Sequence, residues 1–398
     1  MQTRAVYAGF AVFGGFWGAW GGLIPAIRDQ AGISNGQLGT ALLFIGAGAL
    51  PAMLLTGRRV DRWGQPAAGV LLPLLGVVGV VLAATARDLT SLSVGLAMLG
   101  ASSGAADVAI NTVAGAAQQA SGRPIIPRAH ATFSGAVVVS SLFAGTLRAL
   151  GAPLVTAFAL LAVGSVVVAM VLIAGTSRQE QLPLHPNSGQ ARHVRLPVAF
   201  RPLLVLGGLG ALAFAVENGH QSWSALYLQD ALRAGPATAA AGPAVFAAVV
   251  AVSRLAASRL ITLHPSATLL FGSTAAAAGT TIVGAAPTVP IGLLGLGVAA
   301  AGTGVLFPTL LGILTDRVPD GGRGTATSIV TSVAYLGFLA GPVYVGQWAD
   351  KVALRVAMFA LAALAAALAL LALAALRALA LGGMSWSITV EPTRDSPE

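Results

Sequence analysis

Apolar runs of about 20 residues recur along the whole chain, and they constrain its fold more than any other feature. A helix of that length spans the roughly 30 Å hydrocarbon core of a bilayer. No soluble core can hide so many runs, because 56% of the 398 residues are hydrophobic and only 9% are charged. The sequence therefore predicts an all-α membrane protein that crosses the bilayer many times.

Twelve spans are predicted, six on each side of one long polar connection. The limits in the first half are 5–27, 34–56, 67–86, 90–115, 130–148 and 152–174. The limits in the second half are 201–229, 236–258, 267–285, 289–316, 325–346 and 352–378. We therefore expect an N-terminal six-helix bundle (1–176), a cytoplasmic linker (177–200), a C-terminal six-helix bundle (201–380) and a cytoplasmic tail (381–398).

The distribution of basic residues predicts the orientation. Of the 22 Lys and Arg residues, sixteen fall on one side of the predicted spans and six on the other. Positively charged loops remain in the cytoplasm, so both termini are expected there, in a bacterial-type cytoplasmic (inner) membrane. We expect the chain to act as a monomer, with the lipid bilayer and a small-molecule substrate as its partners.

The most charged short stretch lies at residues 57–65, between the second and third spans. It holds three arginines and one aspartate, so it predicts a tight cytoplasmic turn. Asp61 can contact the positive N-terminal end of a helix from the other half, an interaction worth about 0.3–1 kcal/mol. The simpler interpretation is that the arginines only set the topology and contact lipid headgroups.

This turn resembles the signature loop of the major facilitator superfamily, Gly-x-x-x-Asp-Arg-x-Gly, through Gly57, Asp61, Arg62 and Gly64. The span count, the equal halves and the long middle linker agree, so the resemblance covers nearly the whole chain. It implies two pseudo-symmetric six-helix bundles around a cavity that opens to each side in turn. It also implies that these four residues gate the cytoplasmic side together with Arg323, at the start of the eleventh span. The matching loop of the second half departs from the pattern, with Ser258 where an aspartate often lies.

Further stretches resemble the sugar-permease-like branch near fucose:proton symporters, many of whose members have no assigned substrate. This resemblance implies a sugar-like solute. The stretches are Asp107-Val108-Ala109-Ile110-Asn111, Gly122-Arg123-Pro124-Ile125 with His130, Trp223-Ser224-Ala225-Leu226-Tyr227, and the run from Tyr335 to Pro342.

Asp107 and Glu217 are the acids that lie well inside predicted spans. A charge at membrane depth costs at least about 2.5–3.5 kcal/mol, so such a residue normally faces a cavity or a partner. We predict that both carboxyls couple transport to protons, and that Asn111, one turn after Asp107, binds the solute. The alternative is that Asp107 and Asn111 only hydrogen-bond to a neighbouring helix.

Polar and aromatic residues follow Glu217 closely. Helical spacing places Glu217, His220 and Gln221 on roughly one face, with Trp223 to one side. This pattern predicts a substrate-binding cluster made of Asn218, His220, Gln221, Trp223 and Tyr227. The alternative for the two aromatic residues is that they anchor the helix at the membrane surface.

The first span carries aromatic residues at helical spacing, namely Phe13, Phe16, Trp17 and Trp20. Because this span lines the cavity in the superfamily, the resemblance implies that Phe16, Trp17 and Trp20 stack on the substrate. Packing against other helices or lipid is the alternative for each ring. His130 either relays charge or bonds to a neighbouring helix end.

The sequence also excludes several function classes. It has no Gly-x-x-x-x-Gly-Lys-Ser/Thr phosphate loop, no cysteine, and five scattered histidines. We therefore expect no enzyme activity, no metal, no nucleic-acid partner, and no cofactor other than the proton gradient.

These features predict a proton-coupled secondary transporter of a small organic solute that works by alternating access. Uptake by symport is favoured, because the fifth span lacks the Gly-Pro signature of drug:proton antiporters. A proton-driven exporter of amphipathic or drug-like compounds is the first alternative, suggested by the aromatic residues of the first span. A membrane sensor that does not transport is the second.

Overall fold

The computed structural model describes residues 2–63, 65–176, 200–318 and 322–380, except the side chains at 2, 58–65, 171–176, 200, 379 and 380. Within this part, eleven helices are long and apolar enough to cross a membrane. A further apolar helix, α6, occupies the place of the sixth predicted span. The prediction of an all-α membrane fold is confirmed.

The helices follow the predicted order closely. The first half contains α1 (Gln2–Ala31), α2 (Asn35–Trp63), α3 (Gln65–Thr85), α4 (Leu89–Ser121), α5 (Ile125–Ala149) and α6 (Val155–Thr176). The second half begins with α7 (Phe200–Leu226), which continues into a π-helical turn, η1 (Tyr227–Ala231). It then contains α8 (Pro236–Ala239), α9 (Ala241–Ala256), α10 (Ser258–Leu263), α11 (Pro265–Ala285), α12 (Val289–Arg317), α13 (Arg323–Lys351) and α14 (Leu354–Ala380).

Two local predictions need correction. The turn expected at residues 57–65 is mostly helical, because α2 continues to Trp63 and α3 begins at Gln65. Nothing in its run of charged residues breaks a helix, so α2 continues past its apolar part. The predicted eighth span is divided into α8 and α9, and the short α10 lies in the connection that follows.

Local signals define the ends of α4, the helix that carries Asp107. At its start, the Ser91 backbone N–H donates to Asp88 Oδ1 at 2.8 Å, and the Asp88 N–H donates back to Ser91 Oγ at 3.2 Å. The hydrogen bonds from Ser91 hold the pKa of the Asp88 carboxyl below its usual range. At its end, Gly122 takes the left-handed conformation, φ 64°, and its N–H donates to Gln118 O.

Glycines allow close helix packing inside each half. In the first half, a methyl group at Gly48 or Gly100 would overlap a backbone carbonyl of the facing helix, because α2 and α4 lie in contact there. In the second half, a methyl group at Gly337 of α13 would overlap the Ala211 carbonyl of α7. Backbones can approach this closely only where a side chain is absent.

Gly337→Ala is therefore expected to push α13 away from α7 and to lower the thermal stability of the purified protein. Overpacking of this kind costs about 1–3 kcal/mol, and a backbone carbonyl cannot move aside as a flexible side chain can. Gly208→Ala on α7 is the matched control, because a methyl group there meets no atom within 4 Å. Equal melting temperatures for the two variants would contradict this account of the packing.

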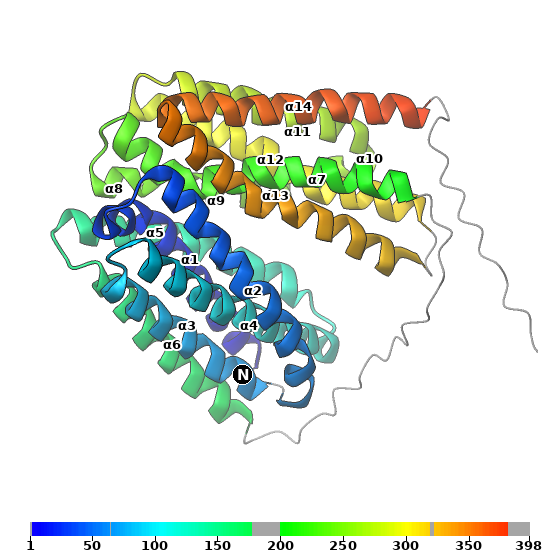
Figure 1. Cartoon of the computed structure of the whole chain (residues 1–398). Coiled ribbons are helices and arrows are strands. Elements are labelled where there is room, and N and C mark those ends of the chain that lie inside the picture. The colour runs from blue at the N-terminus through cyan, green and yellow to red at the C-terminus, as the bar shows by residue number, and fades with distance from the viewer. Residues whose placement is uncertain (1, 64, 177–199, 319–321, 381–398) are drawn as a thin grey trace, which may run out of the picture.

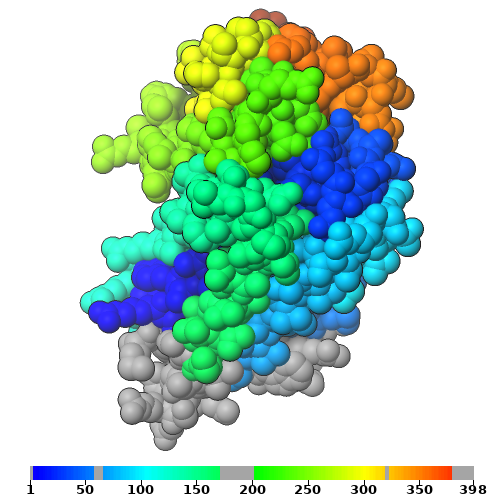
Figure 2. All heavy atoms as spheres, turned by 90° about the vertical axis from the view of Figure 1, so that its left-hand side faces the viewer, coloured from blue at the N-terminus to red at the C-terminus, as the bar shows by residue number. Residues whose placement is uncertain are grey.

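The two halves meet at one end of the molecule and diverge toward the other (Figure 1). At the meeting end, the Ser141 hydroxyl of α5 donates to Ala240 O at 2.8 Å, and Gly145 packs against Pro236 and Ala237. We call this the closed end, because residues of both halves lie against one another across it (Figure 2).

Candidate functional site

A cavity of about 550 Å³ lies between the two halves, and residues of both halves line it. Helices α1, α2, α4 and α5 of the first half line it, together with α7, α9 and α13 of the second. Most of its lining is apolar, and its charged lining residues are Asp107, Glu217 and Arg254. Both acids that the sequence singled out therefore face the same space.

Asp107 occupies the cavity wall in the middle of α4. The Asn111 amide donates to Asp107 Oδ1 at 3.0 Å and to the Asp107 backbone oxygen at 2.9 Å. Asn111 is not among the residues that line the cavity. Asn111 holds the Asp107 carboxylate from within the same helix, and its contact with a substrate stays a prediction.

Glu217 forms an ion pair that the sequence analysis missed. Arg254 Nη2 of α9 lies 3.1 Å from Glu217 Oε1 and 3.4 Å from Oε2, and Arg254 Nε donates to Gly304 O at 3.0 Å. The Glu217 side chain is only 11% exposed, whereas that of Arg254 is 44% exposed. The charge pattern counts Arg254 only as one of the sixteen basic residues on the predicted cytoplasmic side. A usable signal existed, since Arg254 is the one charged residue of the predicted span 236–258.

Several predicted binding residues do line the cavity. Trp17 and Trp20 of α1 lie in its wall, as do Asn218 and Gln221 of α7. Gln221 Nε2 donates to Glu217 Oε1 at 3.2 Å, and Asn218 Nδ2 donates to Phe338 O at 2.5 Å. The sequence did not assign a role to the other polar and aromatic lining residues, which include Ser103, Phe133, Ser134, Ser222, Tyr335 and Phe338.

Other predicted binding residues do not line this cavity in the conformation described, so their role as substrate contacts stays a prediction. Phe16 is buried beside Phe158, with 5.6 Å between the ring centroids. His220 Nε2 lies 2.8 Å from Thr280 Oγ1, and the His220 ring stacks on Phe246. These side chains are on the face of their helix that packs within one half.

The two aromatic residues at the end of α7 are also buried in the protein. Trp223 Nε1 donates to Pro342 O at 3.0 Å, and the Tyr227 hydroxyl donates to Val283 O. Both side chains are fully enclosed by the neighbouring helices. They therefore neither line the cavity nor anchor the helix at the membrane surface.

The predicted gate falls largely outside the described residues. Gly64 and the side chains of Asp61 and Arg62 are not described, so their contact with the second half stays a prediction. Gly57 lies within α2, where a methyl group would meet no atom within 4 Å. Arg323 begins α13, and its Nε donates to the Thr315 and Val318 carbonyls at the end of α12, both at 3.0 Å.

Equivalent residues of the two halves cross-connect at the closed end. Arg28 at the end of α1 places Nη1 2.5 Å from Asp230 Oδ2, and Gln229 Nε2 donates to Asp29 Oδ2 at 3.4 Å. Arg28-Asp29 lies at the end of the first predicted span of the first half, and Gln229-Asp230 lies at the end of the first predicted span of the second half, so the two pairs occupy matching positions. We call these four residues the crossed contact.

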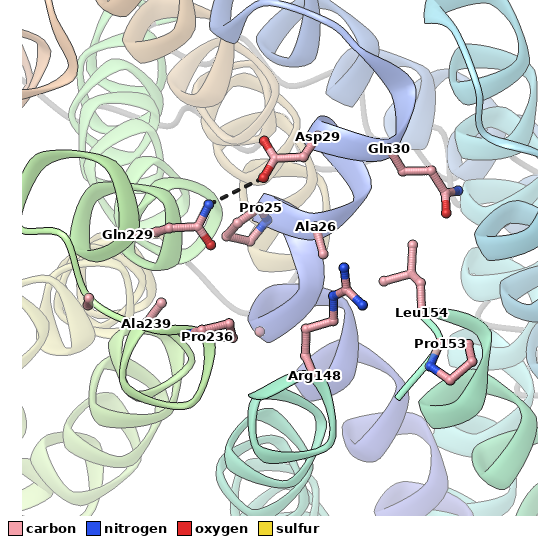
Figure 3. A pocket seen from close by; sticks show the side chains of 12 residues that line it. Pro25, Ala26, Asp29, Gln30, Arg148, Pro153, Leu154, Gln229, Pro236 and Ala239 are labelled. Carbon is pink, nitrogen blue, oxygen red and sulfur yellow. Dashed lines mark hydrogen bonds between the residues drawn. The ribbon is translucent and has the colours of Figure 1, made fainter. Parts of the chain in front are cut away.

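The crossed contact borders a hollow of about 730 Å³ on the surface of the closed end. Figure 3 shows Gln229 extended toward Asp29, with Arg148 of α5 on the opposite wall. Next to the crossed contact, where Arg28 Nη1 donates to Asn35 Oδ1, Ser34 Oγ donates to Asp350 Oδ2 at 2.6 Å. This bond joins the residue before α2 to the end of α13. Polar contacts between the halves therefore gather on this one face.

The fold and the cavity define a membrane transporter built from two helical halves. The sequence pattern of the Major Facilitator Superfamily matches residues 5–342 and 222–381. The chain belongs to this superfamily, so it is a multi-pass membrane transporter of bacterial type and not an enzyme.

Individual relatives agree with this assignment. An uncharacterized MFS-type transporter of Yersinia pestis is 28% identical over 363 residues, covering 91% of this chain and 92% of the relative. The nucleoside transporter NupG has a TM-score of 0.77 at 12% identity, covering 94% of this chain and 100% of NupG. The transporter FucP, solved in an outward conformation, has a TM-score of 0.56 at 17% identity, covering 94% of this chain and 98% of FucP. These structures share the fold.

Proposed function

We propose that this protein is a proton-coupled secondary transporter that moves a small organic solute across the bacterial inner membrane by alternating access. The observation that carries the proposal is that Asp107 of one half and Glu217 of the other line one cavity between the halves. Carboxyls at such a position bind and release protons as the cavity opens to one side and then to the other.

The excess of basic residues on one side supports a cytoplasmic position for both termini. The closed end, which contains Arg28 and Asp230, then faces outward, and the diverging ends of the bundles face the cytoplasm. In this orientation the structure corresponds to a state that is closed to the outside.

The Glu217–Arg254 ion pair offers a route for coupling. Protonation of Glu217 removes the charge that holds Arg254 Nη2, whereas the bond from Arg254 Nε to Gly304 does not depend on that charge. The N–H groups of Arg254 Nη2 then lose their partner and can face the cavity. The position of Arg254 relative to α7 can also change. Binding of a proton is thereby connected to the contact between α7 and α9.

The test is transport by the purified protein in proteoliposomes, using a panel of sugars, sugar acids, nucleosides and amines. An imposed proton gradient should accelerate the flux of at least one compound, and Glu217→Gln should remove the acceleration. If a compound is carried at the same rate with and without the gradient, the protein is a transporter without proton coupling.

Export of amphipathic compounds is the second candidate function. It is favoured by the largely apolar lining of the cavity, in which Trp17, Trp20 and Phe133 lie near few polar groups. Greater sensitivity of a deletion strain to amphipathic compounds would favour export, and loss of growth on a solute would favour uptake.

Loss of the crossed contact should open the outer side. Arg28→Gln removes the ion pair with Asp230, which exists in the outer-closed state described here. Loss of this contact destabilises the outer-closed state, so the outward-open state becomes more populated. The shift follows from a hydrogen bond to a charged group, which is worth about 1.5–3 kcal/mol. A cysteine reporter, Ile24→Cys, should then react several-fold faster with a membrane-impermeant maleimide added outside intact cells.

The design of this experiment uses two features of the chain. Ile24 is buried in the cavity wall one helical turn before Arg28, and the sequence contains no cysteine that would react in its place. Arg87→Gln is the matched control, since Arg87 lies at the same end but bonds within its own half, to Ala84 O. Unchanged labelling in the Arg28→Gln variant would show that the crossed contact does not hold the outer side closed.

A further inference from the structure

The two carboxylates of the cavity are compensated differently. Glu217 is neutralised by Arg254, which bonds both of its oxygens. Among the described residues, the Asp107 carboxylate receives a side-chain hydrogen bond from Asn111, an uncharged donor of its own helix, and forms no ion pair. The wall of the cavity therefore holds one negative charge more than positive when both acids are ionised.

A surplus negative charge in a largely apolar cavity needs a partner. Ionised carboxylates that leave bulk water are stabilised by a proton or by a cation. Asn111 fixes the Asp107 carboxylate without satisfying its charge, so one carboxylate oxygen remains available to the cavity. An ammonium ion forms a charge-assisted hydrogen bond with such an oxygen.

The surrounding wall fits the rest of such a solute. Phe13, Trp17, Trp20 and Phe133 line the cavity from the half that carries Asp107, and Tyr335 and Phe338 line it from the other half. Aromatic faces attract cations and also pack against apolar rings. A densely hydroxylated neutral solute would find few polar partners here, because most of the wall is apolar.

We infer that the cavity takes a solute that carries a protonated amine next to an apolar ring, with the amine bound at Asp107. This inference rests on the proposed function and narrows its substrate class. Because one carboxylate holds either a proton or an ammonium ion, binding of the solute displaces the proton. The two ions are thereby exchanged in opposite directions across the membrane.

The test measures binding of probe compounds to the full chain in lipid nanodiscs at constant pH. Binding is detected by the fluorescence of the cavity tryptophans and by calorimetry. The probes are 2-phenylethylamine and its uncharged isostere 2-phenylethanol. Further amine–alcohol pairs, in which one or two larger rings replace the phenyl ring, extend the series. We expect the wild type to prefer the amine at least about tenfold, because the ammonium–carboxylate pair forms only with the amine.

Asp107→Asn should bind amine and alcohol equally, whereas Asp88→Asn should keep the preference. Asp88 is the matched control because it lies at the start of the same helix, outside the cavity lining, and asparagine serves equally well as a helix N-cap. The inference is overturned if no amine of the series binds, if alcohols bind as tightly, or if Asp107→Asn keeps the preference. Proton-driven transport of an uncharged solute would overturn this inference and leave the proposed function standing.

Discussion

Crosslinking the Ser34→Cys/Asp350→Cys variant is expected to stop transport, and reduction of the crosslink should restore it. Ser34 directly precedes α2, and Asp350 is the next-to-last residue of α13. Ser34 Oγ and Asp350 Oδ2 lie 2.6 Å apart and join the two halves. A covalent link at this place holds the halves together at the closed end, so the outward-open state cannot form. Alternating access requires both states, and we expect at least about a tenfold loss of flux.

The chain is suited to this experiment because it has no native cysteine. A short bifunctional thiol reagent serves as well as direct oxidation, since both side chains are exposed. The two single-cysteine variants, treated identically, are the controls. Full transport by the crosslinked protein would contradict the proposal that the halves separate at this end during the cycle.

Asp107→Asn is expected to abolish the effect of a proton gradient on transport. Asparagine has nearly the same shape as aspartate and can keep a contact with Asn111, but it cannot bind a proton or carry a charge. The flux of a substrate should then depend only on the gradient of that substrate. An imposed proton gradient should no longer accelerate it.

Asp88→Asn in the same proteoliposomes controls for general effects of removing an acid from α4. Equilibrium exchange, in which substrate is present on both sides, separates loss of coupling from loss of the whole transport cycle. If Asp107→Asn retains the full response to the gradient with unchanged pH dependence, Asp107 has a structural role, and the leading assignment is wrong.

Most of the fold was accessible from the sequence, because hydrophobic runs report helices in a membrane directly. The apolar pattern defined the spans, and the motif around Asp61 pointed to the superfamily. The apolar pattern did not reveal helix in the charged stretch at the end of α2. This helix continues through much of the predicted turn to Trp63. The pattern also did not show the division between α8 and α9, because both pieces lie in one continuous stretch without a charged residue before Arg254.

The candidate site was predicted less completely. Hydropathy identifies a buried charge, so Asp107 and Glu217 were found. It does not show which face of a helix lines the cavity, and Phe16, His220 and Trp223 face neighbouring helices of their own half.

Pairings between helices are not visible in one sequence. Arg254 looked like a topology signal until α9 placed it beside Glu217. The crossed contact was visible only as a similarity between two helix ends, and the bond between Arg28 and Asp230 emerged from the packing of the halves.

In our proposal, solute flux through this cavity is coupled to protons. The most direct measurement records protons and solute together in proteoliposomes that contain a trapped pH indicator, with empty liposomes as the baseline. When a gradient of a transported solute is applied without any proton gradient, the wild type should move protons across the membrane, and Asp107→Asn should move solute without protons. Solute flux through the wild type with no change in internal pH beyond that of empty liposomes would contradict the claim.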